Sequence, residues 1–190
     1  MKPQDTQKQI TLTPGRLEIT SKNEIAHYVY PREWTHVTLA QYLKILAMPS
    51  DITWVEETGW LLQSLCTMPE EVLLSLPVDT IRALAKEMDF MVRTAPPIEV
   101  DTIQAGGWTW RRRTDFSGIT YGEIVSLQTV NKRGIQSLPE MLCILLERID
   151  EEGNAIAWDT EAQTAAEDFG NTSVTLVTGV LENFLNGSNG

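Results

Sequence analysis

Apolar positions recur at helical spacing through the middle and the end of the chain. Thr38 and Gln41 have the spacing of a capping box, and Leu39, Leu43 and Leu46 follow on one helical face. The same periodicity, together with capping residues, prolines and glycines, predicts further helices over residues 51–65, 67–76, 81–95, 120–129, 138–149, 159–169 and 174–185. The segment Leu138–Ile149 is apolar almost all round, which predicts the most buried helix of the protein. We expect helical residues 38–94 and 120–149 to share one core.

Alternation typical of strands is confined to two places. Residues 10–20 alternate around Pro14-Gly15, a pair that fits a type II turn, and Ile25–Tyr30 is a second β-leaning piece. This region has few apolar residues, so it predicts an extended N-terminal arm ordered by a neighbouring subunit; an arm folded back on its own domain is the alternative. Gly106-Gly107 favours a tight turn and predicts a hairpin at about 98–113.

These patterns predict a mainly α protein. Residues 1–33 form the β-leaning arm, and residues 34–190 form a single helical domain that carries the small β-hairpin element.

Composition excludes several classes. The chain has 190 residues, 42% hydrophobic and 22% charged, which is ordinary globular composition. No segment approaches the roughly 20 apolar residues of a membrane span, and the polar N-terminus lacks the apolar run of a signal peptide. The net charge is −11, and residues 135–190 hold ten carboxylates against one cation, so electrostatic repulsion opposes nucleic-acid binding.

Residues 108–113 read Trp-Thr-Trp-Arg-Arg-Arg, the one concentrated basic run of this acidic chain. Stacking on single-stranded nucleic acid is one interpretation, but the overall acidity opposes it. A second is a protein-binding hot spot, and a third is a strand with inward tryptophans and arginines paired to nearby acids. The candidate protein-binding residues are therefore Trp108, Trp110, Arg111, Arg112 and Arg113. We expect the arginines and the acidic region 135–190 to associate, within one copy or between copies.

Catalytic chemistry finds little support in the sequence. His27 and His36 lie in no metal-ligand spacing, and no nucleophile elbow or phosphate-binding glycine loop is present. Cys66 and Cys143 sit in apolar helical patterns, which indicates buried free thiols. The paired carboxylates lie at helix starts and in turns, where acids are expected without a catalytic role. We expect no enzyme activity, cofactor or metal.

The order of segments from Trp34 onward resembles that of a known class of proteins. A Thr-capped helix (Trp34–Tyr42) precedes a Met-Pro-Glu-Glu-Val-Leu-Leu-Ser-Leu helix at 68–76. A β-piece with Trp108 and Asp115 follows, then Ile119-Thr120-Tyr121-Gly122-Glu123-Ile124, a Leu-rich helix, an acidic spacer and a closing helix with Phe184. This layout is similar to that of small virion-morphogenesis proteins of tailed bacteriophages, found among tail and neck genes.

The resemblance implies a non-enzymatic structural or assembly protein of the tail or neck. Its partners would be other copies of itself and other phage tail or neck proteins, without membrane. It would be assembled in the host cytoplasm and located in the virion. A tail assembly chaperone absent from the mature particle is the alternative. An acidic cellular adaptor that binds a peptide along the Trp108 strand, and a carboxylate-dependent hydrolase, remain the options from other classes.

Overall fold

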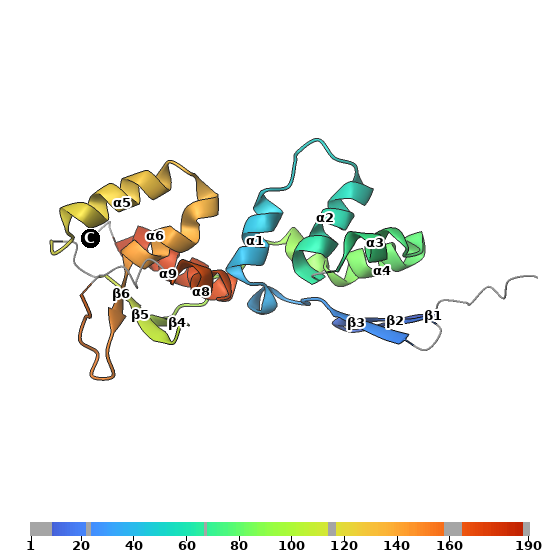
Figure 1. The fold of residues 1–190 in the computed structure, drawn as a ribbon, viewed down its shortest axis with the longest axis horizontal. Coiled ribbons are helices and arrows are strands. Elements are labelled where there is room, and N and C mark those ends of the chain that lie inside the picture. The colour runs from blue at the N-terminus through green and yellow to red at the C-terminus, as the bar shows by residue number, and fades with distance from the viewer. Residues whose placement is uncertain (1–8, 22–23, 67, 114–116, 158–164, 188–190) are drawn as a thin grey trace, which may run out of the picture. The chain divides into compact units, whose positions relative to one another are not determined.

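The fold is mixed α/β, because the described residues contain both helices and strands. A computed structural model describes residues 9–21, 24–66, 68–113, 117–157 and 165–187. The described residues form two three-stranded antiparallel sheets (Figure 1). The prediction of a mainly α protein with one small hairpin and an extended arm is therefore wrong. The chain packs into two compact units, which we describe separately.

Unit 1 comprises the residues up to His36 and Lys44–Thr94. Its sheet has the order β1-β2-β3, formed by β1 (Gln9–Thr13), β2 (Arg16–Ser21) and β3 (Glu24–Val29). Because side chains alternate across a strand, Leu17 and Ile19 of β2 point to one face, where both are buried. The helices of the unit are α2 (Trp54–Cys66), α3 (Glu70–Leu74) and α4 (Val78–Glu87), with 3₁₀ turns at Trp34–His36 and Asp89–Val92.

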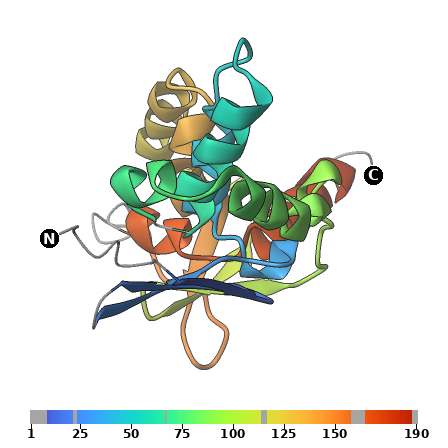
Figure 2. The same cartoon turned by 90° about the vertical axis from the view of Figure 1, so that its right-hand side faces the viewer.

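The N-terminal sheet is folded onto its own unit. It lies along one side of α2, α3 and α4 in both ribbon views (Figures 1 and 2). The Tyr30 hydroxyl donates to the Thr13 carbonyl at 3.0 Å, and Arg32 pairs with Glu87 of α4 at 3.3 Å. The structure thus has the folded-back arrangement, because Leu17 and Ile19 of β2 are buried within unit 1 and need no neighbouring subunit to cover them.

Two helix starts show how local sequence sets the boundaries. Helix α1 (Leu39–Leu46) has the predicted capping box: the Gln41 amide donates to Thr38 Oγ1 at 3.2 Å, and the Thr38 amide donates to Gln41 Oε1 at 2.9 Å. Helix α2 begins at Trp54 rather than after Asp51, because Thr53 and Glu56 exchange the same contacts there. The predicted helices over 67–76 and 159–169 would begin at Thr67 and Asp159, and both of these residues lie outside the described ranges.

Unit 2 comprises Val37–Leu43 and the residues from Ala95 onward. Its sheet has the order β4-β5-β6, formed by β4 (Thr102–Ala105), β5 (Trp108–Arg112) and β6 (Leu146–Ile149). Its helices are α5 (Tyr121–Asn131), α6 (Leu138–Leu145), α8 (Ala166–Gly170) and α9 (Val174–Gly187), with a 3₁₀ turn at Ile135–Ser137. The hairpin turn is confirmed: Gly106 and Gly107 have φ of 61° and 75°, which favour glycine at both positions.

The segment Leu138–Ile149 is not one helix. Helix α6 ends at Leu145, and Leu146–Ile149 continues as β6, antiparallel to β5. The last four residues alternate between buried and half-buried positions, as a strand requires. A short apolar run has no periodicity that separates a buried helix from a strand, so pairing with β5 decides its conformation.

The core of unit 2 gathers around the inner face of this sheet. It contains Leu39, Leu43, Ile103, Ala105, Trp110, Leu142, Cys143, Leu146, Ala165, Phe169, Val177 and Val180. The helical residues 44–94 belong instead to unit 1, so the expected single core for residues 38–94 and 120–149 is wrong. In the part of the chain that the structure describes, no helix is long and apolar enough to cross a bilayer.

Candidate functional site: strand β5 and helix α5

The two tryptophans of the basic run have different environments. Trp110 is 1% exposed; its Nε1 donates to the Ala105 carbonyl at 3.0 Å, and its ring meets Phe169 edge-on with centroids 4.9 Å apart. Trp108 is 39% exposed, and the Arg148 guanidinium lies 5.0 Å from its ring centroid. Trp110 is therefore a core residue, whereas Trp108 is available at the surface beside a cation–π contact.

The three arginines of the run are built into unit 2. Arg111 lies directly opposite Glu147 of β6 and bonds its carboxylate at 2.7 Å. Arg112 is half-buried opposite Leu146. Arg113, with a side chain 12% exposed, pairs with Glu123 at 2.5 Å. The pairing of arginines with acids thus occurs within one copy for Arg111 and Arg113, and the partner of Arg111 belongs to the acidic region 135–190.

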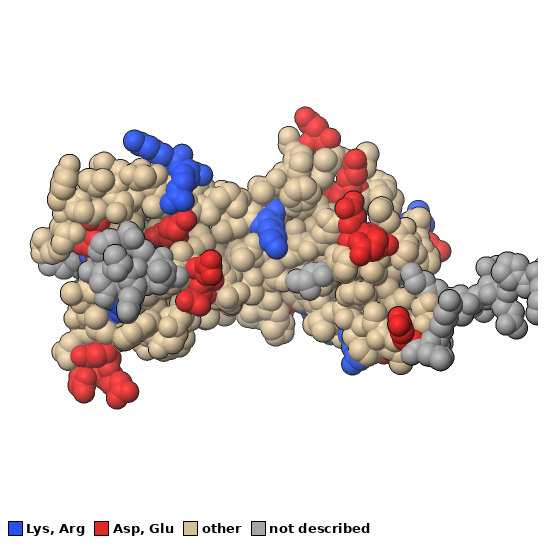
Figure 3. Space-filling model, viewed as in Figure 1, with Lys and Arg blue, Asp and Glu red and all other residues tan. Residues whose placement is uncertain are grey.

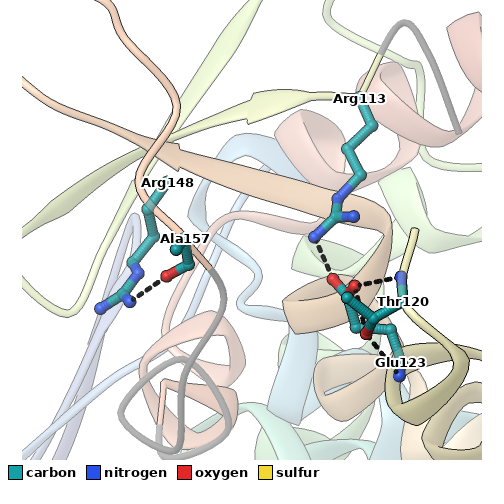
Figure 4. A network of polar contacts seen from close by, with 5 residues as sticks. All are labelled: Arg113, Thr120, Glu123, Arg148 and Ala157. Atoms are coloured by element: carbon teal, nitrogen blue, oxygen red, sulfur yellow. Dashed lines mark hydrogen bonds and ion pairs between the residues drawn. The ribbon is translucent and has the colours of Figure 1, made fainter. Parts of the chain in front are cut away.

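Glu123 is the centre of a buried polar network (Figure 4). It is 2% exposed, accepts from the Thr120 amide and hydroxyl at 2.8 Å each, and completes a capping box at the start of α5. Burial raises the pKa of Glu123, but the hydrogen bonds from Thr120 and the Arg113 guanidinium outweigh it and hold that pKa below its ordinary value. A carboxylate held ionised in this way anchors α5 to the end of β5.

A pocket of about 430 Å³ opens beside this network. Its described lining consists of Arg113, Gly118, Thr120, Glu123, Glu147, Ala155, Ile156 and Ala157. Each charged group of the wall already faces an opposite charge, because Arg113 pairs with Glu123 and Glu147 with Arg111. The described part of the pocket wall therefore offers no uncompensated charge to an ion, and its charged groups act in structure.

The outer surface of α5 is the feature that sequence reasoning missed. Tyr121 is 82% exposed, Ile124 38% and Val125 41%, at i, i+3 and i+4 spacing that places them on one face. Glu123 is the one charged residue of the helix, and it is buried, so this face carries no charge. In the view of Figure 3, the surface over α5 is mostly uncharged. We call Tyr121, Ile124 and Val125 the α5 face.

The sequence contains a signal for the α5 face. The helix is apolar on both sides, with Val130 buried on the opposite side from Tyr121. A helix of a single domain needs one apolar side, so a second one indicates contact with something else.

The cysteine and histidine side chains considered for nucleophilic or metal chemistry lie in environments that do not suit it. Cys66 and Cys143 are buried free thiols, as predicted, and burial raises the pKa of each to about 12, so neither is a thiolate at neutral pH. The His27 ring lies 2.7 Å from an Arg16 guanidinium nitrogen on the sheet of unit 1. Among the described residues, no group of three or more His, Cys, Asp or Glu is placed to hold a metal.

Comparison of the chain with protein-family models, with curated proteins and with solved structures gave no match.

Proposed function

We propose that the protein is a non-enzymatic structural or assembly protein of a bacteriophage tail or neck, and that it acts through protein–protein contacts. The proposal rests on the resemblance in segment order from Trp34 onward. The observation that carries it in the structure is the α5 face, an uncharged aromatic and aliphatic surface on a helix fixed in place at its first turn.

Anchoring makes the α5 face suited to binding. The capping box and the Arg113–Glu123 ion pair hold the first turn of α5 in place. The helix therefore loses little conformational entropy when a partner binds. Exposed helix faces of this kind pack into apolar grooves of partner proteins. Tyr121 is the natural anchor, because tyrosine adds large contact area with few rotatable bonds.

The chemistry of the remaining groups supports a binding role over a hydrolase. Glu123, the most buried carboxylate described, accepts three hydrogen bonds and has a lowered pKa. A general acid needs a raised pKa instead. The alternative within the same biology is a tail assembly chaperone whose α5 face shields an apolar partner and which leaves before the particle is complete.

Deletion and complementation in the phage that carries the gene test this proposal. Deletion should remove tailed particles while filled heads remain, and mass spectrometry of purified wild-type particles should detect the chain. Detection supports the structural role, whereas loss of tails with no chain in particles supports the chaperone. Normal tails and infectivity after deletion would contradict both.

The α5 face has its own variants in the same assay. Complementation with Tyr121→Ser/Val125→Ser should fail to restore tails, although the purified variant keeps the wild-type unfolding transition. Gln128→Ser, an exposed polar change on the same helix, is the matched control and should restore tails fully. Restoration of tails by the double variant would exclude the α5 face as the surface that acts.

A further inference from the structure

Strand β3 is an edge strand with exposed aliphatic side chains. In the sheet order β1-β2-β3, no described strand pairs with the far side of β3. Ile25 is 57% exposed and Val29 is 70% exposed, and both lie on the sheet face opposite to buried Leu17 and Ile19. Edge strands of soluble proteins normally carry charges, prolines or bulges that prevent pairing. Within β3, Glu24 at the first residue is the one Asp, Glu, Lys or Arg.

The backbone of β3 presents its free groups at these same residues. The Tyr30 amide donates to the Gly15 carbonyl at 3.1 Å, which continues the register in which Val29 lies opposite Arg16. Bonded and non-bonded pairs alternate in an antiparallel ladder. Residues 24, 26 and 28 are therefore the ones bonded to β2, and the amides and carbonyls of Ile25, His27 and Val29 face away from the sheet.

This pattern is self-complementary. We propose that β3 pairs antiparallel with β3 of a second copy about a two-fold axis at His27, which joins the two sheets into one six-stranded sheet. In this register Ile25 lies opposite Val29 of the second copy, and His27 lies opposite His27. Every outward-facing backbone group then meets its counterpart, and each exposed aliphatic side chain meets another on the same sheet face. An isologous contact of this kind requires such symmetry about its axis.

The charged side chains nearest this edge do not oppose a second copy. The protein has a net charge of −11, which opposes self-association in general. Around His27, the charged side chains of β2 are Arg16 and Glu18, which offset one another. Two copies therefore meet here with little repulsion.

The other edge of the same sheet lacks this pattern. The outer-face residues of β1 are Gln9, Thr11 and Thr13, which are polar. That edge supplies matched controls in the same sheet and on the same face.

The inference rests on the proposed function in one respect, since it names one partner of an assembly protein as a second copy of the chain.

Sedimentation velocity of the purified full chain over a concentration series tests the dimer. We expect the wild type to shift from monomer to dimer as concentration rises. Ile25→Lys/Val29→Lys should stay monomeric with an unchanged circular dichroism spectrum, because two lysines block the edge. Gln9→Lys/Thr11→Lys adds the same charge to the opposite edge and should dimerise like the wild type. A monomeric wild type, a dimeric Ile25→Lys/Val29→Lys variant, or equal loss of dimer in both variants would overturn the proposal.

A cross-linking experiment tests the register and does not depend on the lysine variants. In a background with Cys66→Ala and Cys143→Ala, His27→Cys should form a disulfide-linked dimer under mild oxidation, because position 27 faces itself across the axis. Ile25→Cys should not, since it faces position 29. If Ile25→Cys cross-links as readily as His27→Cys, the register is wrong. A wild type that stays monomeric would overturn the proposed dimer but not the proposed function. Normal tails after gene deletion would overturn the proposed function, and sedimentation would still show whether the protein dimerises.

Discussion

Strands β5 and β3 show how composition and structural context differ as guides to a binding surface. Strand β5 carries the most conspicuous residues of the chain, yet it is the central strand of its sheet, with Trp110 in the core and Arg111 in an ion pair. Strand β3 reads Glu-Ile-Ala-His-Tyr-Val, which the sequence marks only as a β-leaning piece. It is nevertheless an edge strand with exposed Ile25 and Val29.

The difference follows from the number of neighbours each strand has. A strand paired on both sides has its backbone groups satisfied, and its charged side chains find cross-strand partners. A strand paired on one side retains free amides and carbonyls whatever its side chains are. Position in the sheet therefore decides which strand can bind a partner. Substitutions in and around β5 test this contrast, and their expected effects differ in size.

Trp110→Ala should have the largest effect. It removes a side chain that is 1% exposed and packed on Phe169, so the free energy of unfolding should fall by about 3–5 kcal/mol. Trp108→Ala is the matched control on the same strand and should cost about 1 kcal/mol, mainly through the Arg148 contact. Urea denaturation followed by circular dichroism measures both. Equal losses would show that β5 does not have one buried and one exposed tryptophan.

Glu123→Ala should lower the free energy of unfolding by about 3 kcal/mol, because it leaves Arg113 buried without its partner. Glu123→Gln should cost less, since glutamine keeps the capping box and loses the charge alone. Urea denaturation at neutral pH measures the free energy of unfolding of the wild type and of both variants. A loss under about 0.5 kcal/mol for the alanine variant would contradict the anchoring of α5.

The same carboxylate gives a pH dependence with a defined sign. The folded state lowers the pKa of Glu123, so its stabilising contribution is present above the unfolded pKa of about 4.3 and is lost as pH falls through the folded pKa. The stability gap between wild type and Glu123→Gln should therefore narrow on acidification. A gap that stays constant from neutral pH to strong acid would contradict the lowered pKa.

Arg111→Gln should have the smallest effect, under about 1 kcal/mol, because the side chain of Arg111 is 39% exposed and solvent screens its pair with Glu147. The loss should shrink further in high salt. If this substitution prevented the proposed dimer from forming in sedimentation velocity, β5 would take part in self-association. That result would contradict the assignment of self-association to β3.

The sequence predicted the features that depend on local interactions. The capping box at Thr38, the Gly106-Gly107 hairpin and the buried thiols were each visible in short segments. The missed features depend on partners distant in the chain. Leu146–Ile149 is a strand because β5 lies beside it, and the N-terminal sheet is folded on its own unit, where Arg32 pairs with Glu87 of α4. The exposure of the α5 face depends likewise on what packs around the helix.

Amide hydrogen exchange resolved by residue tests the central contrast most directly. At low protein concentration, the β5 amides should be strongly protected while the Ile25, His27 and Val29 amides exchange rapidly. At high concentration, those three β3 amides should gain protection and the β5 amides should not change. Rapid exchange in β5, or β3 amides equally protected at every concentration, would contradict the account.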